Sequence, residues 1–186
     1  EANPIEPSNL VDLQKAVKKH KADIGLAFDG DADRCFLVDE KGALVNPSAL
    51  TALIATRELA KNPGASIIYN LISSRAVKEV VEESGGTAIR SRVGHSYIKK
   101  LMAETNAVFG GEHSGHFYFR DFWRADSGML AALHAIAALG ESKKSLSELL
   151  KTFNRYHSSG EINSTVKDAA SAMKKIEEIY GSGDGV

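Results

Sequence analysis

Apolar positions along this chain change their spacing several times, and the changes predict alternating helices and strands. Near the amino end, Leu10, Leu13 and Val17 share one helical stripe, and the short apolar runs at 22–28 and 35–38 indicate strands. Further along, the alternation becomes regular. Helices are expected to begin at Pro47, Ser74, Ser96, Asp126 and Ser145, and strands to cover 66–69, 87–91, 107–109 and 117–119. This order is typical of an α/β fold, a layered mixed sheet with helices on its faces.

Two later segments carry more specific expectations. The run from Asp126 to Leu139 is almost wholly apolar, which predicts a helix buried against the sheet. Beyond Tyr156 the pattern restarts, because residues 157–166 resemble a polar strand and a helix follows from Asp168. We therefore expect this last segment to open a further domain.

Between the two amino-terminal strands lie three alternating aspartates, Asp29, Asp31 and Asp33, followed at once by Arg34. Three carboxylates this close repel one another, at about 4 kcal/mol per pair 4 Å apart for an effective dielectric of ~20, so a cation is expected among them. A ligand set made only of oxygens suits a hard ion such as Mg²⁺, which keeps positions open for water and a phosphate oxygen. Arg34 adds a planar donor fork suited to a phosphoryl group.

Two other interpretations fit parts of this loop. Asp and Gly are common turn residues, so the segment from Asp29 to Asp33 also fits a solvated turn. A calcium loop of the EF-hand kind would place Glu40 at its twelfth position. That arrangement fails because Arg34 stands where the loop requires glycine, and because strand-like residues precede it instead of an amphipathic helix.

A second candidate site is the glycine-flanked run from Gly110 to His116. Its glycines let the backbone approach a ligand closely, and its polar groups are those of Glu112, His113, Ser114 and His116. Vicinal sugar hydroxyls need a carboxylate acceptor and an amphoteric hydroxyl, which Glu112 and Ser114 supply. A zinc site made by the carboxylate and the two imidazoles remains an alternative, as does a capped polar hairpin loop.

The third candidate is the stretch from Arg90 to Ser96, in which a strand ends, Gly94 follows and a helix begins. Backbone N–H groups at a helix start, with Arg92 and His95 beside them, form an anion pocket. An ordinary connection between a strand and a helix explains the same residues equally well.

Composition narrows the classes of function. The chain has 186 residues, of which 43% are hydrophobic and 25% charged, enough apolar material for one ordinary domain with appendages. A formal net charge of -1 gives no electrostatic reason to expect nucleic acid or an anionic membrane as a partner. No apolar run is long enough to span a bilayer. The single cysteine, Cys35, excludes an internal disulfide and fits a reducing compartment, so a cytoplasmic location is expected.

The three motifs together, in this order and at about these separations, resemble the α-D-phosphohexomutase family, most closely its phosphomannomutase/phosphoglucomutase branch. The motifs are the acidic loop at 29–34, the glycine-histidine-serine stretch at 93–96 and the loop at 111–116. The resemblance covers nearly the whole chain. It implies that residues 1–42 are the carboxyl-terminal part of domain 2 with a metal-binding loop, 43–153 are domain 3 with a sugar-binding loop, and 154–186 are a linker and the start of domain 4.

Carried over residue by residue, the resemblance gives each candidate a role. Asp29, Asp31 and Asp33 would be Mg²⁺ ligands, and Arg34 would be a catalytic residue beside the phosphoryl group in transfer. Residues of the glycine-flanked loop and two near it would bind substrate, namely Glu112, His113, Ser114, Gly115, His116, His95 and Arg92. Of these, His95, Arg92 and His116 would lie at the rim. Ala32 stands where the family usually has glycine, and if this position needs a positive φ, alanine costs on the order of 1 kcal/mol.

The implied activity is the Mg²⁺-dependent interconversion of the 1- and 6-phosphates of a hexose, mannose or glucose, through a phosphoserine and a bisphosphorylated sugar. The family's phosphoserine loop in domain 1 and its phosphate-gripping loop in domain 4 have no match here, so we expect a middle fragment that is inactive alone. Phosphoglucosamine mutase is the alternative within the family. A non-catalytic module that binds a divalent metal or a sugar phosphate is the alternative from another class.

Overall fold

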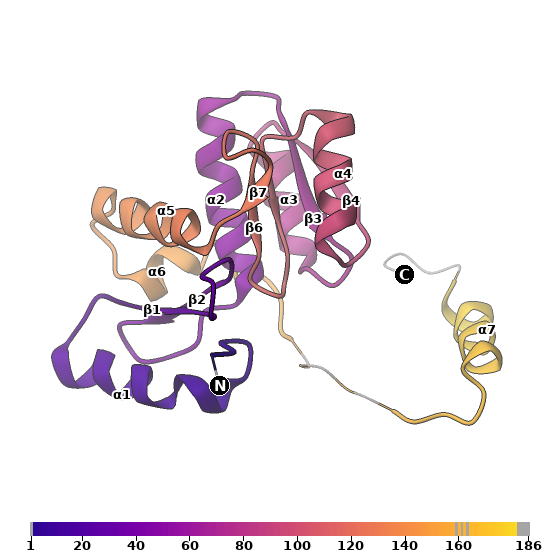
Figure 1. Cartoon of the computed structure of the whole chain (residues 1–186), viewed down its shortest axis with the longest axis horizontal. Coiled ribbons are helices and arrows are strands. Elements are labelled where there is room, and N and C mark those ends of the chain that lie inside the picture. The colour runs from indigo at the N-terminus through magenta and orange to yellow at the C-terminus, as the bar shows by residue number, and fades with distance from the viewer. Residues whose placement is uncertain (1, 159, 161, 163, 182–186) are drawn as a thin grey trace. The chain divides into compact units, whose positions relative to one another are not determined.

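The computed structural model describes residues 2–158, 160, 162 and 164–181, and the chain divides into two compact units, 1–156 and 157–186. The first unit holds two sheets and the helices that cover them (Figure 1). Its helices are a 3₁₀ turn at Pro7–Leu10, α1 (Val11–His20), α2 (Pro47–Lys61), α3 (Arg75–Glu83), α4 (His95–Thr105), α5 (Gly128–Glu141) and α6 (Leu146–Leu150). Its strands are β1 (Ile24–Phe28), β2 (Cys35–Asp39), β3 (Ser66–Asn70), β4 (Thr87–Ser91), β5 (Phe109–Gly111), β6 (Phe117–Phe119) and β7 (Ala125–Asp126).

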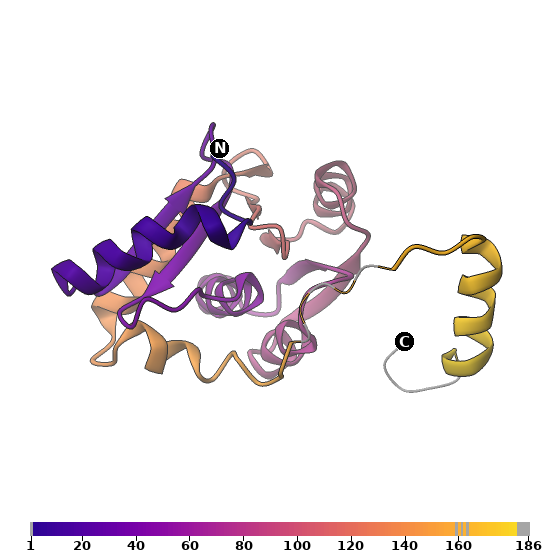
Figure 2. The same ribbon diagram turned by 90° about the horizontal axis from the view of Figure 1, so that it is seen from below.

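The smaller sheet is an antiparallel hairpin of β1 and β2, with Leu26 opposite Leu37 and Phe28 opposite Cys35. Side chains alternate across it, so α1 packs on one face and α5 on the other (Figure 2). This register leaves residues 29–34 as the connection at the end of the hairpin. The acidic loop therefore projects from a rigid two-stranded support, as the sequence predicts.

The larger sheet is mixed, in the order β4-β3-β5-β6-β7. Its first three strands are parallel, β6 runs antiparallel to β5, and β7 runs antiparallel to β6. This confirms the predicted fold class. Because parallel strands end at one edge of a sheet, the segments that follow Asn70, Ser91 and Gly111 meet at that edge.

Helices cover both faces of the larger sheet, with α2 and α3 on one face and α4 on the other. Neighbouring residues of β3 show the alternation: Ile67 joins the core beneath α2, whereas Ile68 packs with Ile98 and Met102 of α4. All four side chains are fully buried. The sheet is therefore held between two apolar layers, and its polar loops are left at the edge.

Local capping signals set several helix starts where the sequence predicts them. The Asn46 side chain accepts a hydrogen bond from the Ser48 N–H ahead of α2, and Ser74 caps α3. Ser145 and Glu148 form the expected capping box of α6. The helix expected from Ser96 begins one residue earlier, and the helix expected from Asp126 begins at Gly128 behind a Ser127 cap.

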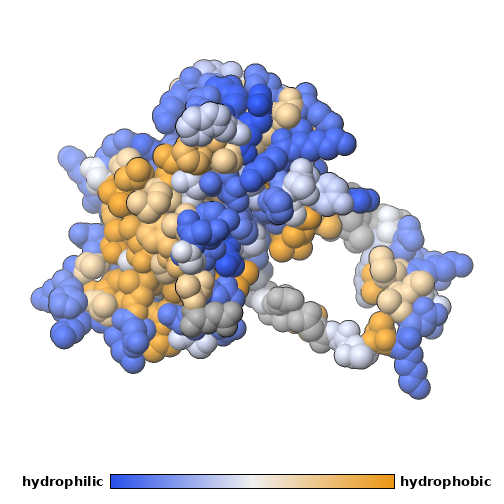
Figure 3. Space-filling model, in the orientation of Figure 1, coloured by the Kyte–Doolittle hydropathy of each residue, from blue (hydrophilic) through white to orange (hydrophobic). Residues whose placement is uncertain are grey.

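Burial of the apolar helix α5 is less complete than its sequence predicts. Its small residues face the core, and Ala131 and Ala135 are fully buried. Its larger residues, Met129, Leu133 and Ile136, are 53%, 56% and 43% exposed. In Figure 3, hydrophobic surface gathers over α5 and α6. The expectation of a wholly buried helix is therefore wrong, because only one side of α5 contacts the two sheets and α2.

Two contacts tie distant parts of the first unit together. Glu40, in the turn after β2, accepts hydrogen bonds from the Ser147 N–H at 3.1 Å and the Ser147 hydroxyl at 2.6 Å. Burial raises the pKa of Glu40, but these hydrogen bonds outweigh it and bring the pKa to about 2.

Cys35 is 1% exposed at the start of β2, and burial raises its thiol pKa to about 12.

The second unit contributes one helix, α7 (Ala169–Tyr180), whose start at Asp168 agrees with the sequence. The strand expected at 157–166 is not found among its described residues, and positions 159, 161 and 163 lie outside them. This segment contains Ser, Gly and Asn, which favour turns over a continuous strand.

In the described part of the chain, no helix has the length and apolar character needed to cross a membrane.

Candidate active site

The acidic loop gathers its three carboxylates at one place. One oxygen each of Asp29, Asp31 and Asp33 lies within 4.8 Å of the others. The loop closes through a hydrogen bond from the Ala32 N–H to the Asp29 carbonyl at 3.3 Å. A second, from the Arg34 N–H to Asp29 Oδ1, measures 3.1 Å. Backbone bonding thus folds the side chains toward one another despite their like charge.

Arg34 is the positive group inside this loop. Its Nε donates to Asp29 Oδ2 at 2.7 Å, and its Nη1 donates to the Asn3 side chain at 3.2 Å. Burial raises the pKa of Asp29, but the hydrogen bonds from Arg34 outweigh it and hold this pKa below its usual value. Burial and the neighbouring Asp29 raise the pKa of Asp33. Asp29 is therefore paired by Arg34 within the loop, whereas Asp33 faces His116 of the loop at 110–116, 3.6 Å away.

Two backbone features shape the loop. Ala32 has φ = 61°, a left-handed conformation. This is the positive φ at which alanine is expected to be strained relative to glycine. Gly128, the first residue of α5, donates its N–H to the Ala32 carbonyl at 3.1 Å. A Cβ at Gly128 would lie 2.5 Å from the Arg34 carbonyl oxygen, so only glycine lets α5 approach the loop this closely.

The glycine-flanked loop, which we call the clasp (residues 110–116), is a tight turn between β5 and β6. Its Gly115 has φ = 89° and donates to the Glu112 carbonyl at 3.1 Å. A Cβ at Gly115 would collide with the ring of Phe36 on β2. The clasp therefore sits directly against the hairpin that carries the acidic loop.

Glu112 is buried in the clasp, at 2% exposure, and is held by three donors. Its Oε1 accepts from Asn70 Nδ2 at 3.4 Å and from the Gly94 N–H at 3.1 Å. Its Oε2 accepts from the Tyr118 hydroxyl at 2.7 Å. Burial and this bond raise the pKa of Tyr118 well above its usual value, so Tyr118 is a donor here. One carboxylate thus joins the end of β3, the start of α4 and the middle of β6.

Backbone pairing joins the acidic loop to the clasp. The Cys35 N–H donates to the Gly115 carbonyl at 3.0 Å, and Arg34 forms an antiparallel bridge with His116. His116 Nε2 lies 3.6 Å from Asp33 Oδ1, and its Nδ1 lies 2.9 Å from the Ser114 hydroxyl. His116 therefore links the two motifs and does not lie only at the rim of the clasp.

His113 points to the other side of the clasp. Its Nδ1 lies 3.5 Å from the hydroxyl of Ser48 on α2, which also accepts from the Ser74 N–H at 3.0 Å. Burial lowers the pKa of His113, which favours the neutral imidazole. Because His113 and His116 contact different partners, the single zinc site considered for Glu112 and both histidines is not among the metal-ligand groups of the described residues.

Arg92 and His95 lie apart from this arrangement. Among the residues that the structure describes, no hydrogen bond or ion pair joins either side chain to the clasp. The Arg92 guanidinium lies 6.0 Å above the Tyr97 ring. Arg92 and Tyr97 line a shallow pocket of about 240 Å³ at the open edge of β4, together with Lys100. It is the Gly94 backbone, not these side chains, that reaches Glu112.

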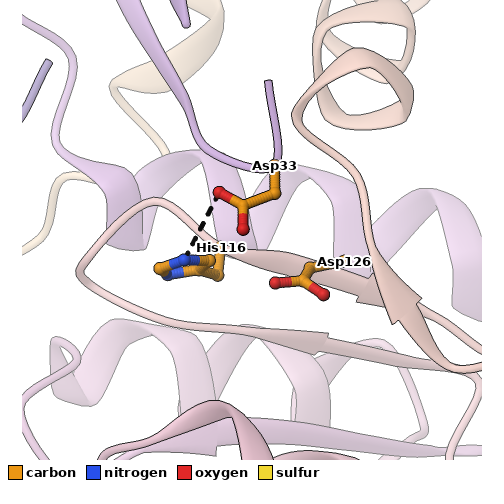
Figure 4. Close-up of side chains that lie close together, drawn as sticks. All are labelled: Asp33, His116 and Asp126. Carbon is orange, nitrogen blue, oxygen red and sulfur yellow. Dashed lines mark ion pairs between the residues drawn. The ribbon is translucent and has the colours of Figure 1, made fainter. Parts of the chain in front are cut away.

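Sequence reasoning missed two residues that complete the site, Asp126 and Lys99. Asp126 pairs opposite Tyr118 across β6 and β7, and its carboxylate lies close to that of Asp33 and to the ring of His116 (Figure 4). Lys99 on α4 places its Nζ 2.8 Å from Asp126 Oδ1. The alternation of β6, which puts His116 and Tyr118 on one face, was an available signal, whereas the two-residue strand β7 leaves no pattern.

Family comparisons agree with this geometry. Residues 46–156 match the family described as phosphoglucomutase/phosphomannomutase, alpha/beta/alpha domain III, and residues 1–42 match the corresponding domain II. A phosphomannomutase of Methanocaldococcus jannaschii is 48% identical over 171 residues, which are 92% of this chain and 38% of that protein. A phosphomannomutase of Escherichia coli is 42% identical over 96% of this chain and 39% of its own length. The chain thus spans about two fifths of these relatives.

Solved structures give the same result. A phosphoglucomutase/phosphomannomutase family protein from Burkholderia thailandensis superposes with a TM-score of 0.76 at 35% identity, covering 80% of this chain and 33% of that one. A putative phosphomannomutase from Thermus thermophilus has a TM-score of 0.74 at 23% identity over 80% and 34% of the two chains, and supports the fold alone. Fold, loop geometry and sequence relatives therefore agree that the chain belongs to the phosphoglucomutase/phosphomannomutase family.

Proposed function

We propose that this chain is the metal- and sugar-binding middle part of a phosphohexomutase, which interconverts the 1- and 6-phosphates of a hexose through a phosphoserine and a bisphosphorylated sugar. One observation carries the proposal. The acidic loop and the clasp, far apart in sequence, are joined by the Cys35–Gly115 backbone hydrogen bond, and His116 of the clasp lies 3.6 Å from Asp33, so the two motifs lie side by side. The relatives named phosphomannomutase support the substrate class.

We assign the parts of the chain accordingly. Residues 1–42 would be the end of domain 2 with the metal loop, residues 43–153 domain 3 with the clasp, and residues 154–186 a linker with the start of domain 4. Domains 1 and 4 of the whole protein would bring the phosphoserine and a phosphate-binding loop. This chain alone is therefore expected to bind but not to turn over a substrate.

Asp29, Asp31 and Asp33 are proposed to hold Mg²⁺. Their donor set is all oxygen and their oxygens lie within 4.8 Å of one another, which fits a hard divalent ion. When bound, Mg²⁺ would neutralise charge on the phosphoryl group during transfer. Arg34 would stand beside that group. Its Nε and Nη1 are engaged, which fixes the guanidinium plane and leaves further N–H donors for a phosphate oxygen.

Glu112 and Ser114 are proposed to bind adjacent sugar hydroxyls. A carboxylate has about four lone-pair positions, and the donors on Glu112 fill three of them. One position on Oε2 remains, so Glu112 would take a single hydroxyl in a fixed direction. Ser114 can donate or accept because its partner is the His116 ring. Such a pair suits a sugar that must bind in two orientations.

The remaining proposed substrate residues act around this pair. His116, which contacts Ser114 and Asp33, would exchange a proton with a sugar hydroxyl near the phosphoryl group. His113 would bind as a neutral ring, and Gly115 would shape the turn. His95 and Arg92 would reach the substrate only from the rim, because neither contacts the clasp in this structure.

Metal binding can be tested on this chain directly. We expect the wild-type chain to bind Mn²⁺, a probe for the Mg²⁺ site, in an isothermal titration. Because loss of even an indirect metal partner costs about 10–100-fold in affinity, Asp31→Asn should weaken Mn²⁺ binding at least about tenfold. Asp23→Asn, which changes an exposed aspartate before β1, is the matched control. Equal affinities for wild type and Asp31→Asn would contradict the proposed metal role.

Turnover is tested in a chimera in which this chain replaces the matching segment of the M. jannaschii phosphomannomutase. The chimera is expected to be active, and its Asp31→Asn variant to lose most of kcat while still binding the sugar phosphate. Unchanged turnover in that variant would favour a non-catalytic binding role. Assays with the 1-phosphates of mannose, glucose and glucosamine then identify the sugar, because phosphoglucosamine mutase is the alternative within the family.

A further inference from the structure

A second group of metal-ligand type lies beside the acidic loop. Asp33, His116 and Asp126 each place one ligand atom within 4.8 Å of the others (Figure 4). They come from three separate elements, namely the acidic loop, the start of β6 and the strand β7. All three are half-buried, and the side chains of His116 and Asp126 are 23% and 12% exposed. Long-range folding, not a local turn, brings them together.

A cationic group already lies against this cluster. The Lys99 ammonium on α4 is 2.8 Å from Asp126 Oδ1 and lies 5.7 Å from the centroid of the Tyr118 ring. Two carboxylates and one imidazole attract more positive charge than one ammonium supplies, and among the described residues the ion pair found for Lys99 is with Asp126. Among the described residues, the ion-pair partner found for Asp33 is His116, at 3.6 Å.

We propose that Asp33, His116 and Asp126 form a second divalent cation site, and that the Lys99 ammonium competes with the ion for it. One imidazole nitrogen with two carboxylate oxygens suits ions of borderline softness, such as Zn²⁺ and Co²⁺, better than Mg²⁺. Asp33 has two oxygens, so it can offer one to this site and one to the acidic loop. The inference rests on the proposed function through two shared residues, Asp33 and His116.

The test uses the complete chain without a histidine tag and Co²⁺ as the probe, because Co²⁺ reports nitrogen ligands in its visible spectrum and shifts the NMR signals of a bound imidazole. We expect Co²⁺ to shift the ring signals of His116. His116→Gln should abolish those signals and the nitrogen contribution to the spectrum. Asp126→Asn should weaken Co²⁺ binding at least about tenfold while Mn²⁺ binding at the acidic loop is kept. Asp121→Asn, an exposed neighbour paired with Arg120, is the matched control.

Lys99→Met provides an independent test, because this variant is expected to bind Co²⁺ more tightly and not more weakly. Removal of the competing ammonium should tighten Co²⁺ binding about tenfold, a change of about 1.4 kcal/mol. Lys100→Met is its control, since Lys100 pairs only loosely with Glu104, at 3.8 Å. Circular dichroism and thermal melts verify that each variant folds.

The proposal is overturned if Lys99→Met leaves Co²⁺ affinity unchanged, or if Asp126→Asn and His116→Gln bind Co²⁺ as the wild type does. Asp31→Asn separates this result from the proposed function. If it removes Mn²⁺ binding but leaves the Co²⁺ effect on His116, the two sites are distinct and both proposals stand. If it removes all binding of both ions, Co²⁺ uses the acidic loop and the second site fails. If Mn²⁺ binding is unaffected, the proposed magnesium role fails and the second site is judged by its own variants.

Discussion

At residue scale, Ala32 holds the acidic loop in a conformation that favours glycine. A left-handed conformation costs a residue with a Cβ about 1–2 kcal/mol, while glycine costs about 0.5–1 kcal/mol in chain entropy. We therefore expect Ala32→Gly to raise the free energy of unfolding by about 0.5–1 kcal/mol in denaturant titrations. Ala103→Gly, at an exposed helical position in α4, is the control and should lower it by about 1 kcal/mol. A destabilised Ala32→Gly would show that the left-handed geometry is not what the loop requires.

Glu40 provides a pH-dependent prediction at the same scale. Its pKa of about 2 in the folded chain lies below the ordinary value of 4.5, so the carboxylate stabilises the fold above pH 4.5, and this contribution is lost as the pH falls toward 2. We expect Glu40→Gln to lower the free energy of unfolding by about 1–2 kcal/mol at pH 7 and by less at pH 3.5. Glu104→Gln, an exposed control, should stay within about 0.5 kcal/mol of wild type at both. A deficit that does not depend on pH would exclude this electrostatic origin.

Single residues also show what sequence can reveal. The alternation of Asp29, Asp31 and Asp33 predicted a convergent carboxylate cluster because the signal is local, within one hairpin turn. Lys99 and Asp126 were missed because their partners are distant in sequence. From sequence alone, a lysine on an amphipathic helix is expected to be exposed to solvent. Only the folded chain places Lys99 against the Asp126 carboxylate.

At the scale of elements, α5 is the helix on which the acidic loop rests. Gly128→Ala would place a Cβ 2.5 Å from the Arg34 carbonyl, so the loop must shift. We expect a loss of about 1–3 kcal/mol in stability and weaker Mn²⁺ binding, measured by thermal melts and titration calorimetry. Gly140→Ala in the same helix meets no atom within 4 Å, so it should add about 0.5–1 kcal/mol and leave the metal affinity alone. Similar effects for both variants would contradict this account.

The elements that sequence predicted well are those with local start signals. Asn46, Ser74 and the pair Ser145 and Glu148 cap their own helices, and such hydrogen bonds need no tertiary partner. The burial of α5 was misjudged for the opposite reason. An apolar composition indicates that every side of a helix can be buried. The number of elements that contact the helix decides how many of its sides are buried.

At the scale of the whole molecule, the two units differ in how they are stabilised. The first has two buried clusters, and its last residues are anchored when Arg155 pairs with Glu83 and Glu79 of α3. In α7 no described residue is buried. We therefore expect a chain that ends at Tyr156 to melt within about 2 °C of the complete chain in calorimetry. A clearly lower melting temperature would mean that the second unit stabilises the first.

The meeting of the acidic loop and the clasp is the feature that sequence could not supply. The residues of both motifs were recognisable, but their contact depends on β2 pairing through Cys35 with Gly115 and on Phe36 packing against the same glycine. Such long-range pairing follows from the whole arrangement of sheets. Family resemblance suggested it, and only the folded chain displays it.

The position of Cys35 has a practical consequence. It is the only sulfhydryl of the chain, it lies at the junction of hairpin and clasp, and its protonated, enclosed state makes it inert while that junction is closed. The rate at which an alkylating reagent modifies Cys35 would therefore measure how often the hairpin and the clasp separate. Transient opening of the contact between hairpin and clasp can thus be followed through the native thiol, without an added label.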